Sequence, residues 1–155
     1  MVHGNLKASN VFVRDDDTCL LADFGRAKSF YLFSKASVYY NTPYWTAPEL
    51  IRTGNASIVS RCTDVWSLGC TVYEMISKRP PWSDKKSLSL LPAIAYAEKP
   101  PEYPSAISAE LRDFLNSCFQ IDPAQRANVN DLTRHPFIQR EKLAGNLAHL
   151  QSQSS

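Results

Sequence analysis

The sequence lacks a strong charge of either sign and any long apolar run. Its 155 residues include 17 basic and 15 acidic side chains, for a formal net charge of +2. This balance argues against a nucleic-acid-binding protein, which would carry a strongly basic face, and against a polybasic membrane-binding surface. No apolar run approaches the roughly 18 residues that a membrane-spanning helix needs, and the first residues do not resemble a signal peptide. We therefore expect a soluble, cytoplasmic protein.

The sequence also lacks paired cysteines and clustered histidines. Its four cysteines, at positions 19, 62, 70 and 118, form no C-x-x-C motif. The three histidines, at positions 3, 135 and 149, are too far apart to match the usual spacing of metal ligands. We expect buried, reduced thiols, which are typical of cytoplasmic proteins.

The composition is sufficient for one packed domain, and its periodicity predicts helices. Hydrophobic residues make up 44% of the chain and aromatic residues 11%, which argues against intrinsic disorder. Apolar residues recur at helical spacing over 63–77 and occupy most faces, so this segment should be a buried helix. Thr63 or Asp64 is its expected N-cap.

Four further helices and one hairpin complete the expected fold. Pro48 and Glu49 should open a short helix, and the others are expected over 90–97, 108–120 and 128–134. Pro92 is tolerated if it falls in the first turn of its helix, Ser108 can cap the helix over 108–120, and Pro136 should stop the last one. Two short strands, 11–13 and 19–22, are joined by a polar turn and should pair as a β-hairpin.

Three short motifs follow one another along the chain. Residues 3–10, HGNLKASN, resemble the protein-kinase catalytic loop H-R-D-L-K-x-x-N. Residues 23–25 match the metal-binding D-F-G, and residues 47–49 match the A-P-E that closes the activation segment. Each motif alone is weak evidence, but their order and spacing together are specific. The chain is therefore similar to the protein kinase family, with residues 29–46 as a long functional loop.

Within that family the sequence resembles the MAP-kinase-kinase-kinases and related Ser/Thr kinases. Residues 41–49, NTPYWTAPE, are similar to their G-T-P-Y-W-M-A-P-E, and Lys7 and Thr42 are features of Ser/Thr rather than tyrosine kinases. The resemblance implies a mainly α, protein-kinase-like C-terminal lobe with a short β-hairpin between the catalytic loop and D-F-G. This lobe would occupy residues 1–139, followed by a C-terminal tail over 140–155.

The resemblance also implies the chemistry of the site. Kinases transfer the γ-phosphoryl group of ATP to a protein hydroxyl, with Mg²⁺ neutralising the phosphate charge. Asp23 offers the hard carboxylate that suits Mg²⁺, and Asn10 offers an amide oxygen of the kind that holds the second ion in this family. Lys7 could lie near the transferring phosphoryl group. The expected cofactors are Mg²⁺ and ATP, and the expected partner is a protein substrate or another kinase.

Two positions in the catalytic loop depart from the family pattern. Asn5 stands where kinases carry the Asp that accepts the substrate's hydroxyl proton, and general-base assistance contributes about 10²–10⁴-fold in rate. Gly4 replaces the Arg that pairs with a phosphorylated activation loop in many kinases. Two interpretations stay open. One is a Ser/Thr kinase in which Asn5 still orients the hydroxyl; the other is a pseudokinase that acts as a scaffold or allosteric partner, since H-G-N loops resemble those of known pseudokinases.

The resemblance assigns further roles to residues outside the catalytic loop. Glu49 is expected to pair with Arg126, and Asp64 is expected to accept backbone N–H bonds from the catalytic loop. Ser37 is a candidate phosphosite in the activation segment, although unmodified hydroxyls are at least as compatible with Gly4. Thr42 would face the substrate.

Some kinase elements do not occur within the 155 residues. Five glycines are present, and none forms the G-x-G-x-x-G phosphate loop. We therefore expect that the isolated chain neither binds Mg-ATP tightly nor phosphorylates a generic substrate. A truncated product of a larger kinase would explain this pattern, and so would a genuine short protein that binds a partner through an uncovered helix face; we favour the first.

Overall fold

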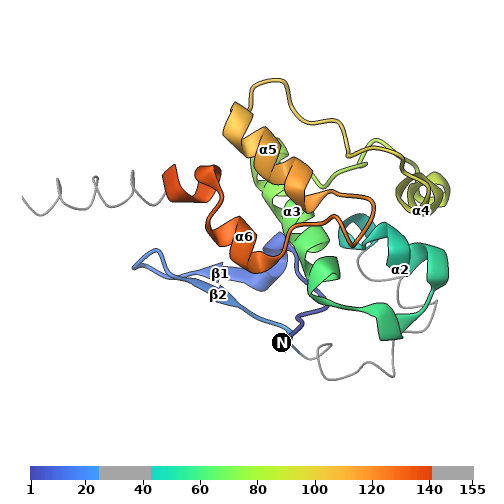
Figure 1. Cartoon of the computed structure of the whole chain (residues 1–155), viewed down its shortest axis with the longest axis horizontal. Coiled ribbons are helices and arrows are strands. Elements are labelled where there is room, and N and C mark those ends of the chain that lie inside the picture. The colour runs from blue at the N-terminus through green and yellow to red at the C-terminus, as the bar shows by residue number, and fades with distance from the viewer. Residues whose placement is uncertain (25–42, 141–155) are drawn as a thin grey trace, which may run out of the picture.

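The computed structural model describes residues 1–24 and 43–140, which form a mainly helical fold with one small sheet, in agreement with the expected class (Figure 1). Its helices are α2 (Pro48–Thr53), α3 (Arg61–Ser77), α4 (Ser87–Ala95), α5 (Ala109–Cys118) and α6 (Val129–Thr133), and its 3-10 turns are η1 (Ala8–Asn10), η4 (Pro43–Trp45) and η5 (Ala56–Ile58). Strands β1 (Val11–Val13) and β2 (Cys19–Leu21) pair antiparallel. Within the described ranges no helix is long and apolar enough to cross a bilayer. Ser37 and Thr42 lie outside the described residues.

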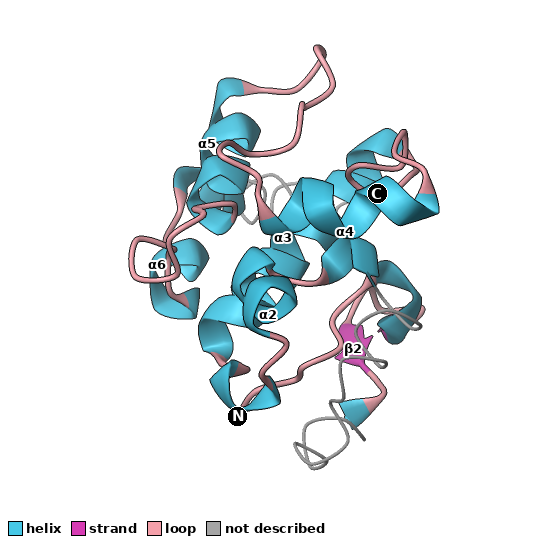
Figure 2. Ribbon diagram, turned by 90° about the vertical axis from the view of Figure 1, so that its right-hand side faces the viewer, coloured by secondary structure: helices cyan, strands magenta, loops and turns pink. Residues whose placement is uncertain are grey.

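Helix α3 is the centre of the fold, with α5, η4 and η1 packed on it and β2 at the edge of the molecule (Figures 1 and 2). It begins at Arg61 because Ser60 is extended and its backbone N–H donates to the Thr63 hydroxyl (3.1 Å). The expected N-cap at Thr63 or Asp64 was therefore wrong, since Ser60 is the cap and Thr63 closes the first turn. Lys78, in the left-handed conformation (φ 58°), ends the helix.

An aromatic cluster fills the space beside α3 and α5. Trp66 on α3 is fully buried, and its ring stacks on that of Trp82 with centroids 6.0 Å apart and an interplanar angle of 9°. Phe119, directly after α5, meets the Trp66 ring edge-on at 5.0 Å. Such aromatic pairs stabilise a fold by about 0.5–1.5 kcal/mol beyond the burial of their area. Leu111 and Leu115, on the buried face of α5, extend the same core.

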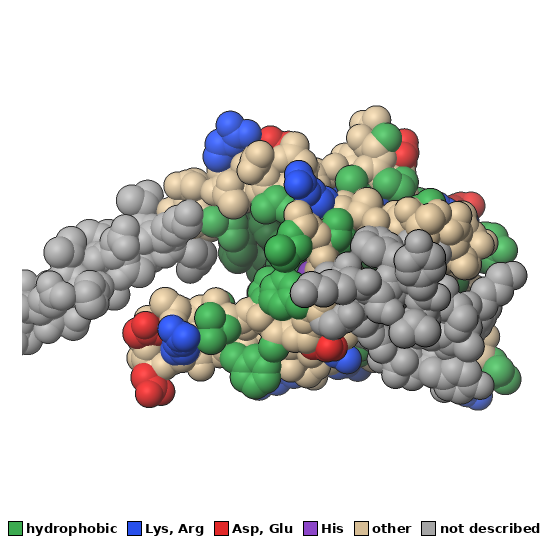
Figure 3. Space-filling view, turned by 90° about the horizontal axis from the view of Figure 1, so that it is seen from below, with side chains coloured by type: hydrophobic (Ala, Val, Ile, Leu, Met, Phe, Trp, Pro, Cys, Tyr) green, Lys and Arg blue, Asp and Glu red, His purple; other side chains and the backbone are tan. Residues whose placement is uncertain are grey.

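The β-hairpin differs from the helices because its apolar side chains remain exposed. Phe12 and Val13 of β1 are 57% and 66% exposed, and Leu20 and Leu21 of β2 are 43% and 46% exposed. In the space-filling view, hydrophobic side chains are visible on the face that includes this hairpin, next to acidic and basic side chains (Figure 3). The hairpin therefore contributes little to the core of the described residues.

The four cysteines divide between these two environments. Cys70 on α3 and Cys118 on α5 are buried, whereas Cys62 is half-buried and Cys19 on β2 is exposed. Burial raises the pKa of the Cys118 thiol to about 12 and raises the pKa of the Cys70 thiol well above its usual value. The expectation of buried thiols was wrong for Cys19, because the short sheet that carries it is not covered by the described residues.

Helix α4 begins earlier than its sequence pattern predicted. It starts at Ser87 rather than at residue 90, because the Lys86 carbonyl already accepts a hydrogen bond from the Leu90 N–H (3.0 Å). Pro92 consequently lies inside the helix and not in its first turn.

The expected stop at Pro136 is only partly right. α6 does end before it, at Thr133, but residues 136–140 are helical again, so Pro136 opens this helical segment. The first helical position suits proline because its missing N–H would have no intrahelical partner there.

Candidate active site

The catalytic-type loop, residues 3–10, is anchored on the first turn of α3. Asp64 accepts two backbone hydrogen bonds, from the His3 N–H to Oδ2 (2.7 Å) and from the Gly4 N–H to Oδ1 (2.8 Å). Gly4 has a φ of 74°, which glycine adopts without strain. The backbone contact expected of Asp64 is thus present, and it fixes the start of the loop to the most buried helix.

His3 links this loop to the segment that carries Asp23. Its Nε2 donates to the Ala22 carbonyl (2.9 Å), because its Nδ1 is occupied in accepting the Asn5 backbone N–H (3.2 Å). Its ring also packs edge-on against Phe24, with centroids 4.6 Å apart. In the sequence, His3 is recognisable as the first residue of the catalytic-type motif and as one of three isolated histidines, and neither feature indicates this linking role.

Asn5 lies between the two residues expected to hold metal. Its side-chain Nδ2 donates to Oδ2 of Asp23 (2.5 Å), and its backbone carbonyl accepts a hydrogen bond from Nδ2 of Asn10 (2.7 Å). Within the loop, Asn5 and Asn10 are buried and Lys7 is half-buried. Asp23, which follows β2, is exposed. The structure therefore brings the three polar side chains together, although their positions span residues 5–23.

The donor set at this place fits Mg²⁺. The described part of the chain contains no group of three or more His, Cys, Asp or Glu side chains that could hold a metal. Mg²⁺, however, is usually bound through one or two carboxylates together with substrate phosphates and water. Asp23 supplies one carboxylate, and Asn10 retains Oδ1 as a ligand atom because its Nδ2 is already engaged. These two residues could hold the ion with the phosphates of a nucleotide.

A second polar anchor connects α2 to the segment between α5 and α6. Arg126 donates from Nη1 to Oε1 of Glu49 (2.7 Å) and from Nη2 to Oε2 (3.1 Å), and also reaches the carbonyls of Cys62 and Gln120. Its guanidinium lies 5.1 Å from the centroid of the buried Trp66 ring. The expected ion pair is present, and its bidentate geometry and extra hydrogen bonds satisfy the buried charges.

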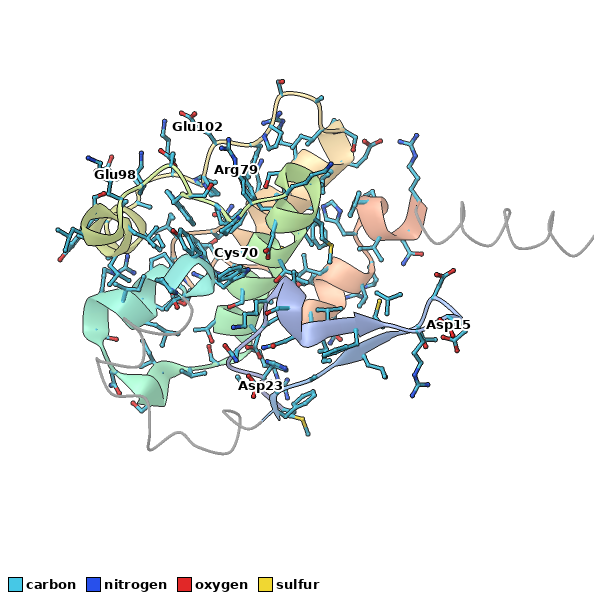
Figure 4. All side chains as sticks on the ribbon, turned by 180° about the vertical axis from the view of Figure 1, so that it is seen from behind. Asp15, Asp23, Cys70, Arg79, Glu98 and Glu102 are labelled. Atoms are coloured by element: carbon cyan, nitrogen blue, oxygen red, sulfur yellow. The ribbon has the colours of Figure 1, made fainter. Side chains whose placement is uncertain are left out.

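A groove lies away from this loop. It has a volume of about 1200 Å³ and runs beside the end of α3 and the end of α4, with Trp82 among its lining residues. Figure 4 shows three of its charged residues, Arg79, Glu98 and Glu102, towards the end of α3 that is distant from Asp23. This groove therefore takes no part in the arrangement around the catalytic-type loop.

The motif order and the geometry of the loop agree with a match over most of the sequence. The family described as protein kinase domain matches residues 1–138. The chain therefore belongs to the protein kinase family.

Curated relatives refine this similarity. The chain is 40% identical over 141 residues to Mitogen-activated protein kinase kinase kinase A of Dictyostelium discoideum, covering 89% of the chain and 14% of that protein. It is 35% identical over 137 residues to Mitogen-activated protein kinase kinase kinase 3 of Arabidopsis thaliana (88% and 22%). It is 38% identical over 138 residues to Cell division control protein 7 of Schizosaccharomyces pombe (89% and 12%). The chain is thus MAP-kinase-kinase-kinase-like, and it spans between 12% and 22% of the length of these relatives.

Proposed function

We propose that this chain forms the metal- and substrate-facing part of a Ser/Thr protein kinase of the MAP-kinase-kinase-kinase type. The reaction is transfer of the γ-phosphoryl group of ATP to a hydroxyl of a protein substrate. The observation that carries the proposal is the convergence of Asn5, Asn10 and Asp23 through two hydrogen bonds. Membership of the protein kinase family supports the reaction class.

The roles in the proposed site follow from the chemistry of each side chain. Asp23 and Asn10 would hold Mg²⁺, and the ammonium group of Lys7 would stabilise the negative charge of the phosphoryl group. Bound Mg²⁺ would neutralise the charge of the phosphates. Asp64 keeps the backbone of the loop in place through its two hydrogen bonds. Asn5 can orient a substrate hydroxyl by hydrogen bonding, but it does not take up the proton, so the reaction is slow.

A phosphate-transfer assay with radiolabelled ATP, Mg²⁺ and a generic Ser/Thr protein substrate tests this proposal. It is run with the chain and with the longest natural polypeptide that contains it. In the longer polypeptide Asn5→Asp should raise the rate by about 10²–10⁴-fold, because it restores a general base. Asp23→Asn should abolish transfer in the same background. A rate that does not respond to Asp23→Asn would contradict the assigned site.

A pseudokinase that acts as a scaffold or allosteric partner is the second candidate. The hydrogen bond between Asn5 and Asp23 favours it, because the carboxylate that would bind metal is already held by a protein group. If Asn5→Asp gives no gain in the longer polypeptide, the second candidate is the better description.

A further inference from the structure

Asn5 contacts the two proposed Mg²⁺ residues through different parts of its structure. Its backbone carbonyl accepts from Asn10, whereas its side-chain amide donates to Asp23. Asn5 is 7% exposed and Asn10 is 9% exposed, so the contact between them is shielded from water, whereas Asp23 is exposed and its contact with Asn5 is only partly buried. Substitution of the Asn5 side chain therefore removes the contact to Asp23 and leaves the backbone contact to Asn10 available.

Asp23 has a left-handed backbone conformation. Its φ of 63° lies in a region that aspartate adopts more readily than most other non-glycine residues. From this backbone position its carboxylate receives the Asn5 amide at 2.5 Å. An N–H donor presents positive partial charge to the carboxylate, as a bound cation would.

We infer that Asn5 is a positioning residue that substitutes for a cation at Asp23. Its amide holds the carboxylate in place without metal and competes with a divalent cation for Oδ2. The amide occupies Oδ2 of Asp23, so a cation could still bind through Oδ1 alone. The amide opposes bidentate binding of a cation through both oxygens. This inference rests on the proposed function, since it takes Asp23 to be a metal ligand. Its consequence is a site that keeps its shape without Mg²⁺ and binds divalent cations weakly.

An aspartate at position 5 would reverse both properties. Two carboxylates within hydrogen-bonding distance repel each other, and a cation placed between them relieves that repulsion. The site would then depend on metal for its shape and would bind the metal more tightly. The identity of residue 5 therefore controls metal dependence as well as the presence of a general base.

Binding of Mn²⁺ to the chain, followed through the electron paramagnetic resonance signal of the free ion, tests this inference. Asn5→Asp should bind Mn²⁺ at least about tenfold more tightly than the wild type, since it adds a charged ligand and removes the competing amide. Asn5→Leu removes the amide without adding charge and should bind about three- to tenfold more tightly. Asn130→Asp adds the same charge at an exposed position on α6 and should leave binding unchanged.

Thermal unfolding supplies a second readout that does not depend on catalysis. The melting temperature of the wild type should be the same with and without millimolar Mg²⁺, because the amide already holds Asp23. The Asn5→Asp variant should melt at a lower temperature without Mg²⁺ and recover when Mg²⁺ is added. A wild type that is stabilised by Mg²⁺ as strongly as Asn5→Asp would overturn the inference.

The remaining outcomes separate this inference from the proposed function. Unchanged Mn²⁺ affinity in both Asn5 variants, or weaker affinity in Asn5→Leu, would overturn the role of Asn5. Asp23→Asn, made in the Asn5→Asp background, reports on the metal site itself. If it lowers Mn²⁺ binding while the Asn5 variants match the wild type, the metal site stands and the role of Asn5 falls. If it changes nothing, the proposed metal site falls as well.

Discussion

The helical core and the catalytic-type loop are stabilised by opposite kinds of contact. Around α3, large rings such as those of Trp66 and Phe119 are fully buried and pack on one another. The loop is held mainly by hydrogen bonds, two of them from its backbone to Asp64, and it continues into a hairpin with exposed apolar side chains. Resistance to unfolding should therefore reside in the core, whereas the geometry of the site depends on a few polar contacts.

The largest expected contrast between the two regions is in cysteine reactivity. The thiolate is the reactive form, and burial raises the pKa of the Cys118 thiol to about 12 and that of Cys70 well above its usual value. Cys19 on the hairpin is exposed. Iodoacetamide should label Cys19 at least about 10³-fold faster than Cys70 or Cys118, which become accessible mainly through global unfolding.

Mass spectrometry of labelled peptides over time checks this contrast. In concentrated urea the three thiols should react at similar rates, which serves as the control. Native labelling of Cys118 as fast as that of Cys19 would show that the core is open and would break the comparison.

The next largest effect is expected from truncation of the central aromatic side chain. Trp66→Ala should lower the free energy of unfolding by about 3–5 kcal/mol, because it leaves a cavity against Trp82 and Phe119. It also removes the ring beneath the guanidinium of Arg126. Urea unfolding followed by circular dichroism measures the change. A loss below about 1 kcal/mol would mean that the cluster is not the main source of stability.

The smallest effect is expected from the matched truncation in the hairpin. Phe12 is 57% exposed, so Phe12→Ala should change the free energy of unfolding by no more than about 0.5 kcal/mol. Because exposed apolar patches favour association, the same variant should self-associate less than the wild type in sedimentation velocity. A destabilisation as large as that of Trp66→Ala would place the hairpin within the core.

Local signals were sufficient to predict much of the helical part. α5 was expected from its amphipathic pattern, and Ser108 caps it as expected, with its hydroxyl accepting the Leu111 N–H (3.1 Å). The start of α3 was misplaced because Ser60 and Thr63 are both residue types that favour caps. Sequence alone does not show which of the two is extended. The exposure of Cys19 was not predicted because an apolar strand is buried only where another element packs on it, and none of the described residues covers this strand.

The site could be predicted from its motifs but not in its details. The order of H-G-N, D-F-G and A-P-E indicated which residues carry polar chemistry, and the contact between Glu49 and Arg126 followed from the family resemblance. The hydrogen bond from Asn5 to Asp23 could not be predicted, because it depends on the distance between two segments that the hairpin brings together. Ser37 and Thr42 remain predictions, since they lie outside the described residues.

The ion pair between Glu49 and Arg126 also constrains how the chain folds during synthesis. The two residues are 77 positions apart, and a ribosome adds about 5–20 residues per second, so about 4–15 s separate their synthesis. During that interval the Glu49 carboxylate must remain in water, because burial of an unpaired charge is strongly unfavourable. α2 can therefore take its final place only after Arg126 has emerged. In nascent chains of this protein, α2 should therefore remain undocked until Arg126 has been synthesised and can pair with Glu49.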